Sequence, residues 1–191
     1  MVYRAVNMSE GSNKVVFAAG RLNPPTKGHG VLIRRVKETA ERLGARAMLY
    51  IVDGEKSGKD KSKNPLTGEQ RVEIARRLYP GVTIDVVGSA YEVLEVLDLQ
   101  YLEPEVWVAG SDRAANYRRL LSSEKLECEV LEVDREAGEA DGVSATAARK
   151  AAIEGNMEEF ALHMPSDLNP RELAEIADMI REVTYGRTNQ E

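Results

Sequence analysis

Three clusters of residues in this sequence carry the donors and cations that bind phosphate groups. The first is the loop over residues 20–30, where Gly28 and His29 precede an apolar helical pattern. A helix N-terminus offers unpaired N–H donors, and glycine lets the backbone approach an anion closely. His29 would add an imidazole donor to the same anion. The alternative is a histidine that only caps its own helix, which is the more common role of an isolated Gly-His pair.

The second cluster is a basic segment in an acidic chain. Four Lys and three Arg lie between residues 56 and 77, against three acidic residues, whereas the whole sequence has a net charge of −6. A solvated loop is the usual explanation of such a charge run. The segment nevertheless follows the second predicted strand, on the same edge as His29. We therefore interpret it as a flexible polyphosphate clamp.

The third cluster opens a predicted helix near residue 144. Ser144 is a good N-cap residue, Thr146 lies in the first turn and Arg149 lies one turn further along. Hydroxyls, free N–H groups and a guanidinium would thus meet at one helix end, where a polyphosphate is stabilised. A simple serine cap beside an exposed arginine is the alternative.

The elements that must position these clusters alternate between strand and helix. Short β-branched runs predict strands over residues 14–20, 47–52, 82–87, 106–109 and 128–133, and helical spacing of apolar residues predicts helices over 31–43, 68–78, 91–97 and 112–121. This order is typical of an α/β fold, a doubly wound parallel sheet covered by helices on both faces. In such sheets ligands bind beyond the carboxyl ends of the strands, where all three clusters fall.

No further strand is predicted after residue 143. Helical patterns over residues 144–154, 157–161 and 170–185 indicate a C-terminal helical segment. We expect a core over residues 1–150 and a helical segment over residues 151–191 packed on it.

Composition excludes several classes of protein. A net-acidic chain with a pI near 5.2 lacks the overall field of a general nucleic-acid binder. Cys128 is the only cysteine, so internal disulfides are excluded, and with two histidines a Cys/His zinc site is not expected. No segment approaches the length of a membrane span, so we expect a cytoplasmic protein without a membrane partner. Cys128 is expected to be a buried thiol in the last strand, and His163 a solvated side chain.

Two of the clusters resemble motifs of the HIGH-motif nucleotidylyltransferase superfamily. Residues 20–29, Gly-Arg-Leu-Asn-Pro-Pro-Thr-Lys-Gly-His, resemble its GxFxPxHxGH-like loop, and residues 143–149, Val-Ser-Ala-Thr-Ala-Ala-Arg, resemble its ISSTxIR motif. Two residues depart from the first motif. Leu22 stands at the usual aromatic position, and Thr26 stands at the first histidine and cannot carry a positive charge.

Two further segments extend the resemblance, which spans residues 15–168. Residues 63–71 look like the lysine loop and helix of the nicotinamide-mononucleotide adenylyltransferase branch. The turn Gly110-Ser111-Asp112 is similar to one that contacts the nucleoside in relatives, although Asp112 as an ordinary helix cap is nearly as good an explanation. The chain looks most like phage-encoded members, which would place it in the host cytoplasm.

The resemblance implies a Rossmann-like nucleotidylyltransferase core and transfer of a nucleoside monophosphate, preferably AMP from ATP, to a phosphorylated small molecule with release of pyrophosphate. Nicotinamide mononucleotide is one candidate acceptor. Mg²⁺ is implied by the family, although no residue pattern identifies its ligands, and a homo-oligomer is left open. The implied catalytic residues are His29, Thr26, Lys63 and Arg149, and the implied binding residues are Gly20, Arg21, Asn23, Gly28, Lys61, Gly110, Asp112, Ser144 and Thr146.

Three alternatives stay open. Thr26 in place of histidine is compatible with a non-catalytic nucleotide-binding module that regulates a partner. A CTP-dependent cytidylyltransferase would use the same phosphate cradle. An RNA-binding role for the basic segment ranks last, because the segment lacks interleaved aromatic residues.

Overall fold

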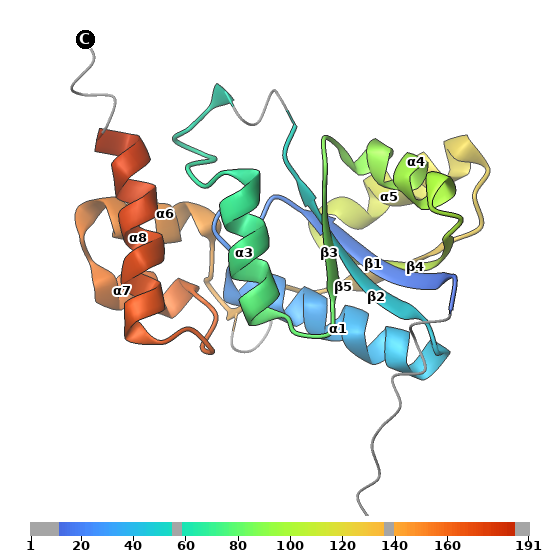
Figure 1. The fold of residues 1–191 in the computed structure, drawn as a ribbon, viewed down its shortest axis with the longest axis horizontal. Coiled ribbons are helices and arrows are strands. Elements are labelled where there is room, and N and C mark those ends of the chain that lie inside the picture. Colours follow the sequence, from blue (N-terminus) through green and yellow to red (C-terminus); the bar gives the residue numbers. More distant parts are fainter. Residues whose placement is uncertain (1–11, 55–58, 136–139, 186–191) are drawn as a thin grey trace, which may run out of the picture.

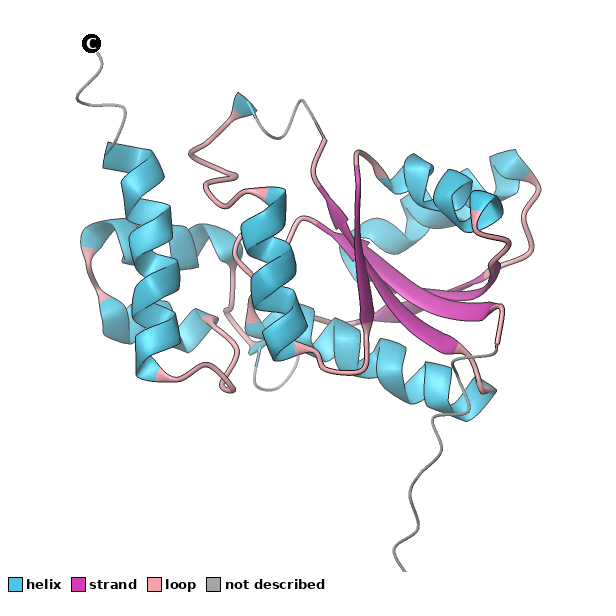
Figure 2. Cartoon of the chain, in the orientation of Figure 1, coloured by secondary structure: helices cyan, strands magenta, loops and turns pink. Residues whose placement is uncertain are grey.

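The fold is a five-stranded parallel sheet with helices on both faces (Figures 1 and 2). The structure is a computed structural model that describes residues 12–54, 59–135 and 140–185. The elements are β1 (Lys14–Gly20), α1 (Lys27–Leu43), β2 (Arg46–Val52), α3 (Gly68–Leu78), β3 (Thr83–Val87), α4 (Ala90–Leu99), β4 (Glu103–Gly110), α5 (Ser111–Glu124), β5 (Glu129–Val133), α6 (Ala145–Glu154), α7 (Met157–His163) and α8 (Pro170–Tyr185).

The strand order is β3-β2-β1-β4-β5. The chain runs outward from β1 through β2 to β3 and then crosses back to β4, so the direction of winding reverses between β1 and β4. The carboxyl ends of these two strands form the crevice where doubly wound sheets bind ligands. The predicted fold class is confirmed.

The apolar residues of the central strand serve two cores, one on each face. Val16 and Ala18 of β1 pack into a core with α1, α3 and the C-terminal helices, whereas Val15 and Phe17 pack into a second core with α4 and α5. Successive strand residues point to opposite faces, so both faces of a central parallel strand must be apolar. This burial explains the continuous run Val-Val-Phe-Ala in the sequence.

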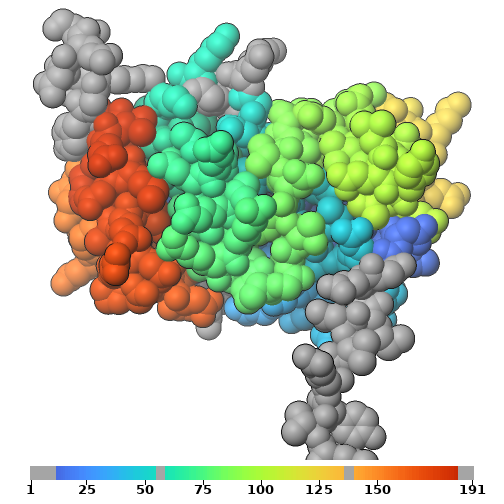
Figure 3. Space-filling model, in the orientation of Figure 1, coloured from blue at the N-terminus to red at the C-terminus, as the bar shows by residue number. Residues whose placement is uncertain are grey.

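The C-terminal helices lie beside α3 and belong to the core that contains α1 and α3. Phe160 of α7 and Ile180 of α8 are fully buried and belong to the same core as Val16. In Figure 3 the C-terminal helices, orange to red, form one continuous surface with α3. The predicted division of the chain after residue 150 stays a prediction. Within the described part of the chain, no helix is long and apolar enough to cross a membrane.

Three local predictions need correction. Helix α1 begins at Lys27 and not at residue 31, because Thr26 caps it and His29 already belongs to its first turn. Cys128 lies one residue before β5 and is only partly buried. The prediction of a solvated His163 is wrong, because its side chain is 8% exposed and its Nε2 atom lies 3.1 Å from a carboxylate oxygen of Glu159.

Candidate functional site

A cavity of about 620 Å³ lies at the carboxyl ends of β1 and β4. The loops after these strands and the start of α6 bring together residues that lie more than 120 positions apart in the sequence. Ten of the thirteen predicted site residues line this cavity: Gly20, Arg21, Asn23, Thr26, Gly28, His29, Lys63, Asp112, Ser144 and Arg149. Residues from all three predicted clusters therefore meet in one cavity.

The imidazole of His29 is held by the residue that caps its own helix. The backbone N–H of Thr26 donates to Nδ1 of His29 over 3.1 Å, and the Thr26 hydroxyl lies 2.8 Å from the same nitrogen. A nitrogen that accepts a backbone N–H cannot carry the ring proton of a neutral imidazole. The proton of neutral His29 is therefore on Nε2, which becomes a hydrogen-bond donor.

The surroundings of His29 keep the ring neutral. Burial, and then the positive charge of Arg135 and of Arg21, lower the pKa of His29 to about 4, although Asp112 acts in the opposite direction. At neutral pH the side chain is an uncharged donor. Positive charge near the site comes from the arginines instead.

Asn23 joins three of the predicted motifs and is itself buried. Its side-chain amide donates to the carbonyl oxygen of Leu66 (2.9 Å) and accepts from the backbone N–H of Leu66 (3.0 Å). The backbone carbonyl of Asn23 accepts a hydrogen bond from Nη1 of Arg149 (2.8 Å). The sequence analysis placed Asn23 among the binding residues. Its side-chain amide, however, is occupied by the two hydrogen bonds to Leu66 that join the two loops.

Arg71 is a second buried connector, and sequence reasoning assigned it to the flexible clamp. Its side chain is 1% exposed and pairs with Asp53 at 2.5 Å. Its Nη1 atom donates to the carbonyl oxygens of Arg21 (2.7 Å) and Val52 (3.0 Å), and its Nε atom donates to that of Thr67. Arg71 therefore fixes the loops after β1 and β2 to the start of α3 and is not available to a ligand.

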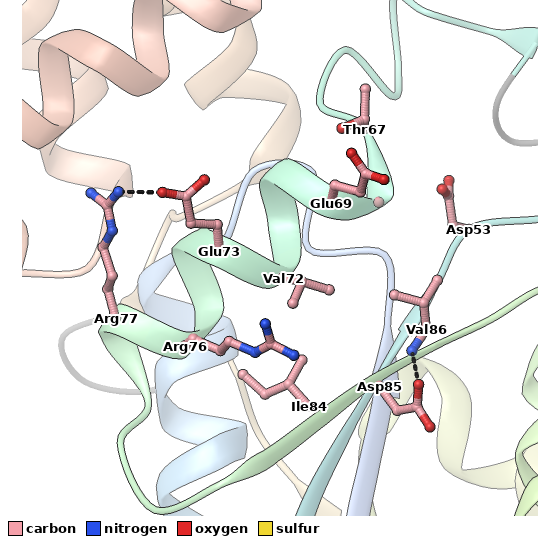
Figure 4. Close-up of a pocket in the computed structure, with 11 residues that line it drawn as sticks. Asp53, Thr67, Glu69, Val72, Glu73, Arg76, Arg77, Ile84, Asp85 and Val86 are labelled. Carbon is pink, nitrogen blue, oxygen red and sulfur yellow. Dashed lines mark hydrogen bonds and ion pairs between the residues drawn. The ribbon is translucent and has the colours of Figure 1, made fainter.

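The rest of the basic segment is divided between several surfaces. Lys63 lines the cavity of about 620 Å³. Lys61 lines neither this cavity nor a smaller one of about 420 Å³ beside it, and Lys56 lies outside the described residues. Arg76 and Arg77 line a different cavity, of about 970 Å³, between α3 and β3 (Figure 4). The prediction of a single clamp over residues 56–77 is therefore wrong, because Arg71 is bound to the loops after β1 and β2, and Arg76 and Arg77 line the other cavity.

The larger cavity in Figure 4 is unsuited to a polyphosphate. Its described lining carries two arginines and four carboxylates, Asp53, Glu69, Glu73 and Asp85, and Glu73 pairs with Arg77. Carboxylates at this density repel a polyanion. The smaller cavity, with five Lys or Arg side chains and one carboxylate in its described lining, has the opposite charge balance.

The third predicted cluster is assembled at the start of α6. The Ser144 hydroxyl accepts the backbone N–H of Ala147 (3.0 Å), which confirms it as the N-cap. Nη2 of Arg149 donates to the Thr146 hydroxyl over 3.1 Å. Thr146 itself lines an adjoining cavity of about 420 Å³. Burial and the nearby charge of Arg21 lower the pKa of Arg149, so an anion between these two guanidinium groups is favoured.

Arg135 is a site residue that sequence reasoning missed, because it stands at the start of an acidic run that is typical of a solvated loop. Its guanidinium pairs with Asp112 at 2.5 Å and lines the cavity with His29. Gly110 makes room for it, since a Cβ atom at Gly110 would overlap with Nε of Arg135. The usable signal was its position two residues after β5, at the carboxyl edge of the sheet.

Two glycines of the first motif serve packing. A Cβ atom at Gly28 would lie 3.1 Å from the backbone oxygen of Arg135, and one at Gly20 would lie 3.1 Å from the side chain of Leu22. Gly28 thus lets α1 approach the segment after β5. Leu22, in the position of the usual aromatic residue, is buried and adopts a left-handed φ of 46°.

The cavity has one aromatic wall. Tyr117 of α5 lines it and stacks on Trp107, with ring centroids 4.0 Å apart and an interplanar angle of 15°. Trp107 is fully buried and supports this wall from the core. Among the described residues, no group of three or more His, Cys, Asp or Glu side chains could hold a metal ion.

Comparison with known proteins gives a family and a fold. Residues 17–151, more than half of the chain, match the cytidylyltransferase-like family. No curated protein matches the sequence. Among solved structures, Plasmodium falciparum nicotinic acid mononucleotide adenylyltransferase complexed with APC is 12% identical over 93% of this chain and 99% of that one, with a TM-score of 0.56.

Two further solved structures are similar over part of their length. Thermotoga maritima TmcAL, bound with alpha-thio ATP, is 17% identical over 91% of this chain and 57% of its own, with a TM-score of 0.56. A macrolide-efflux protein from Streptococcus pneumoniae is 19% identical over 79% of this chain and 54% of its own, with a TM-score of 0.57. The chain thus spans just over half the length of these two proteins, and the likeness concerns the fold.

Proposed function

The chain belongs to the cytidylyltransferase-like family, and on that premise we propose that it transfers a nucleoside monophosphate from a nucleoside triphosphate to a phosphorylated small molecule. The observation that carries the proposal is the orientation of His29. Its Nε2–H is a fixed, neutral donor in a cavity whose described lining has five cationic side chains and one carboxylate. Such a site suits a reaction in which negative charge develops on phosphate oxygens.

The reaction needs no nucleophile from the protein. An oxygen of the acceptor phosphate attacks the α-phosphorus of the donor, and a new P–O–P linkage forms as the bond between the α-phosphorus and the bridging oxygen breaks. Both electrons of the broken bond leave with pyrophosphate. The protein contributes by aligning the two reactants and by stabilising the charge on the departing oxygens.

The site residues take distinct parts in this proposal. Nε2 of His29 donates to the α-phosphate and bridging oxygens, and Thr26 holds the ring in that orientation. Lys63 and Arg149 neutralise the leaving pyrophosphate, while Ser144 and Thr146 bind the outer phosphates. Gly20, Arg21, Gly28, Lys61, Gly110 and Asp112 stay binding residues of the proposal, and Asn23 acts through Leu66 and Arg149.

Magnesium would enter with the nucleotide. Among the described residues no group of three or more His, Cys, Asp or Glu side chains could hold the ion. Asp112 is the one carboxylate in the described lining of the cavity, and it is paired with Arg135. We assign no step to Mg²⁺.

ATP is the preferred donor, because two of the similar structures are described with ATP-like ligands or as an adenylyltransferase. CTP is the second candidate, favoured by the family description. A nicotinamide-mononucleotide-like compound remains one candidate acceptor. We place the reaction in the cytoplasm, that of the host if the protein is phage-encoded.

One observation favours the catalytic proposal over the non-catalytic alternative. That alternative rested on Thr26 standing where relatives have histidine. In the structure Thr26 orients His29 through its backbone N–H and its hydroxyl, and nucleotide binding alone would not require an oriented imidazole.

The test is pyrophosphate release with Mg²⁺, crossing ATP and CTP against nicotinamide mononucleotide, phosphopantetheine, phosphocholine and sugar phosphates. His29→Ala should lower turnover at least ~100-fold while nucleotide binding survives. Near-normal turnover in this variant would refute the role of His29. ATP binding without pyrophosphate release in any combination would favour the non-catalytic module.

A further inference from the structure

The cavity of about 970 Å³ between α3 and β3, which we call the α3–β3 groove, lies apart from the proposed active site. It shares no described lining residue with the cavity around His29. One of its walls is β3, the edge strand of the sheet, whose neighbour in the described part of the chain is β2 alone. The groove therefore runs along a sheet edge that no further described strand covers.

The floor of the groove is apolar and partly exposed. Val72 of α3 and Ile84 and Val86 of β3 line it, and in Figure 4 the Val72 side chain points toward β3. Ile84 is buried, but Val86, two residues further along the same face of the strand, is 41% exposed. Apolar side chains exposed at a sheet edge favour contact with another protein surface.

The backbone of β3 is blocked against strand addition at one point. The N–H of Val86 donates to the carboxylate of Asp85 over 2.8 Å. An acidic side chain that occupies a donor of an edge strand works against pairing with another strand. A partner in the groove should therefore dock through side chains, and α3 presents most of these.

The exposed face of α3 carries opposite charges at its two ends. Glu69 in the first turn and Arg76 in the last turn lie seven residues apart, about 10 Å along the helix axis, and both line the groove. Val72 and Glu73 lie between them on the same face. Among the described residues, neither Glu69 nor Arg76 has an ion-pair partner, whereas Glu73 pairs with Arg77.

This pattern is complementary to itself. In a two-fold dimer each residue pair occurs twice with the roles of the two chains exchanged. A two-fold axis opposite the middle of α3 sets the two helices antiparallel, with Glu69 facing Arg76 of the partner subunit. A purely basic partner would satisfy only Glu69, and a purely acidic partner only Arg76. A second copy satisfies both and covers Val72 and Val86.

We propose that the α3–β3 groove is the interface of a homodimer, in which Glu69 and Arg76 form two ion pairs between the chains. The partner is a second copy of this chain, docked through α3. The proposal does not depend on nucleotidyl transfer, because the groove and the candidate site have separate linings.

The first experiment is sedimentation velocity of the full chain over a range of protein concentrations, at low and at high salt. We expect a monomer–dimer equilibrium whose dissociation constant rises with salt, because exposed ion pairs are screened. A monomer at every concentration up to about 0.5 mM, or a dimer that salt does not weaken, would overturn the inference.

Charge reversal then tests the pairing itself. Arg76→Glu and Glu69→Arg each turn two attractive contacts into two repulsive ones, and each should raise the dissociation constant of the dimer at least about tenfold. An equimolar mixture of the two variants should nevertheless associate. In the mixed dimer the new carboxylate at residue 76 faces the new guanidinium at residue 69, and the native Glu69 faces the native Arg76.

Arg34→Glu is the matched control, because Arg34 is an exposed arginine of α1 that lies outside the groove and has no ion-pair partner among the described residues. It should dimerise like the wild type, and circular dichroism reports whether each variant is folded. Wild-type association of folded Arg76→Glu alone, or no association in the mixture of folded variants, would overturn the inference. Either result leaves the proposed function standing, and a dimer without nucleotidyl transfer refutes only that function.

Discussion

The Nδ1 atom of His29 accepts a hydrogen bond from the backbone N–H of Thr26, three residues earlier in the chain. In a capping box a Glu or Gln side chain at this position reaches back to the N-cap N–H, and here an imidazole does so. The same bond that closes the helix start therefore fixes the tautomer of the ring. The donor of this bond is a backbone group, and the Thr26 hydroxyl lies 2.8 Å from the same nitrogen.

The tautomer and the lowered pKa of His29 can be observed directly. Because the sequence has two histidines, imidazole nitrogen and proton NMR spectra contain two ring systems, and the His29→Gln variant assigns them. We expect His29 to be the Nε2–H tautomer at neutral pH and to titrate near pH 4. A protonated ring at pH 6, or the Nδ1–H tautomer, would contradict the proposed donor.

The same shift predicts how His29 affects stability as the pH changes. The unfolded chain protonates His29 below the ordinary histidine pKa of 6.5, whereas the folded protein does so only near 4. Between these values the unfolded state binds more protons, so His29 destabilises the fold progressively as the pH falls from 6.5 to 4. Chemical unfolding at about pH 7 and about pH 4.5 should show that His29→Gln loses less stability than the wild type. An equal loss would mean that the ring is already charged in the folded state.

Arg71 should be needed for folding more than any exposed arginine of α3. Replacing it by methionine leaves the partly exposed Asp53 carboxylate and the backbone carbonyls of Arg21 and Val52 without this donor, and each polar group that loses its partner costs about 1–3 kcal/mol. Arg76→Met on the same helix is exposed and should cost less than about 0.5 kcal/mol. Urea unfolding measures both. Similar losses in the free energy of unfolding would show that Arg71 does not hold the two loops to α3.

The amide of Asn23 should matter for stability and for the site together. Asn23→Ala removes two buried hydrogen bonds to Leu66, each contributing about 0.5–1.5 kcal/mol, and releases the loop before α3. We expect a loss of about 1–3 kcal/mol in urea unfolding and weaker ATP binding by calorimetry. Asn116→Ala, whose side chain contacts the exposed Arg119, is the control. Unchanged ATP affinity in Asn23→Ala would show that the hydrogen bonds between Asn23 and Leu66 do not position the site.

The sequence alone predicts the sheet, and it predicts that the three clusters fall at its carboxyl edge, because both predictions depend on local patterns. Short apolar runs such as Val15–Phe17, with breaks at glycine or proline, indicate buried strands, and the carboxyl edge of a parallel sheet follows from the order of these strands. The individual partners of charged residues are different. One basic segment contains Arg71, Arg76 and Lys63, yet these side chains have different surroundings. Helix α3 points Arg71 inward to Asp53 and places Arg76 in the other cavity, whereas the loop before α3 places Lys63 in the candidate site. Arg135 was missed for the same reason, since its partner Asp112 lies 23 residues earlier.

The pairing of Gly110 with Arg135 gives the sharpest test of the site. A methyl group at residue 110 would overlap with Nε of Arg135 and lie 2.7 Å from a carboxylate oxygen of Asp112, so the guanidinium must leave its place. The φ of Gly110 is −67°, which suits alanine, so the fold should survive. Gly110→Ala and Arg135→Ala should each weaken ATP binding by about tenfold, and the double variant by no more than either alone.

The matched control for these variants is Gly30→Ala. Gly30 lies in the first turn of α1, next to His29, and a Cβ atom there would meet nothing within 4 Å. Its ATP affinity should equal that of the wild type. Calorimetric titration of the variants and the wild type separates two explanations. Additive losses from Gly110→Ala and Arg135→Ala would mean that the two residues act independently and that the glycine has another role. Non-additive losses would mean that Gly110 affects ATP binding through the position of Arg135.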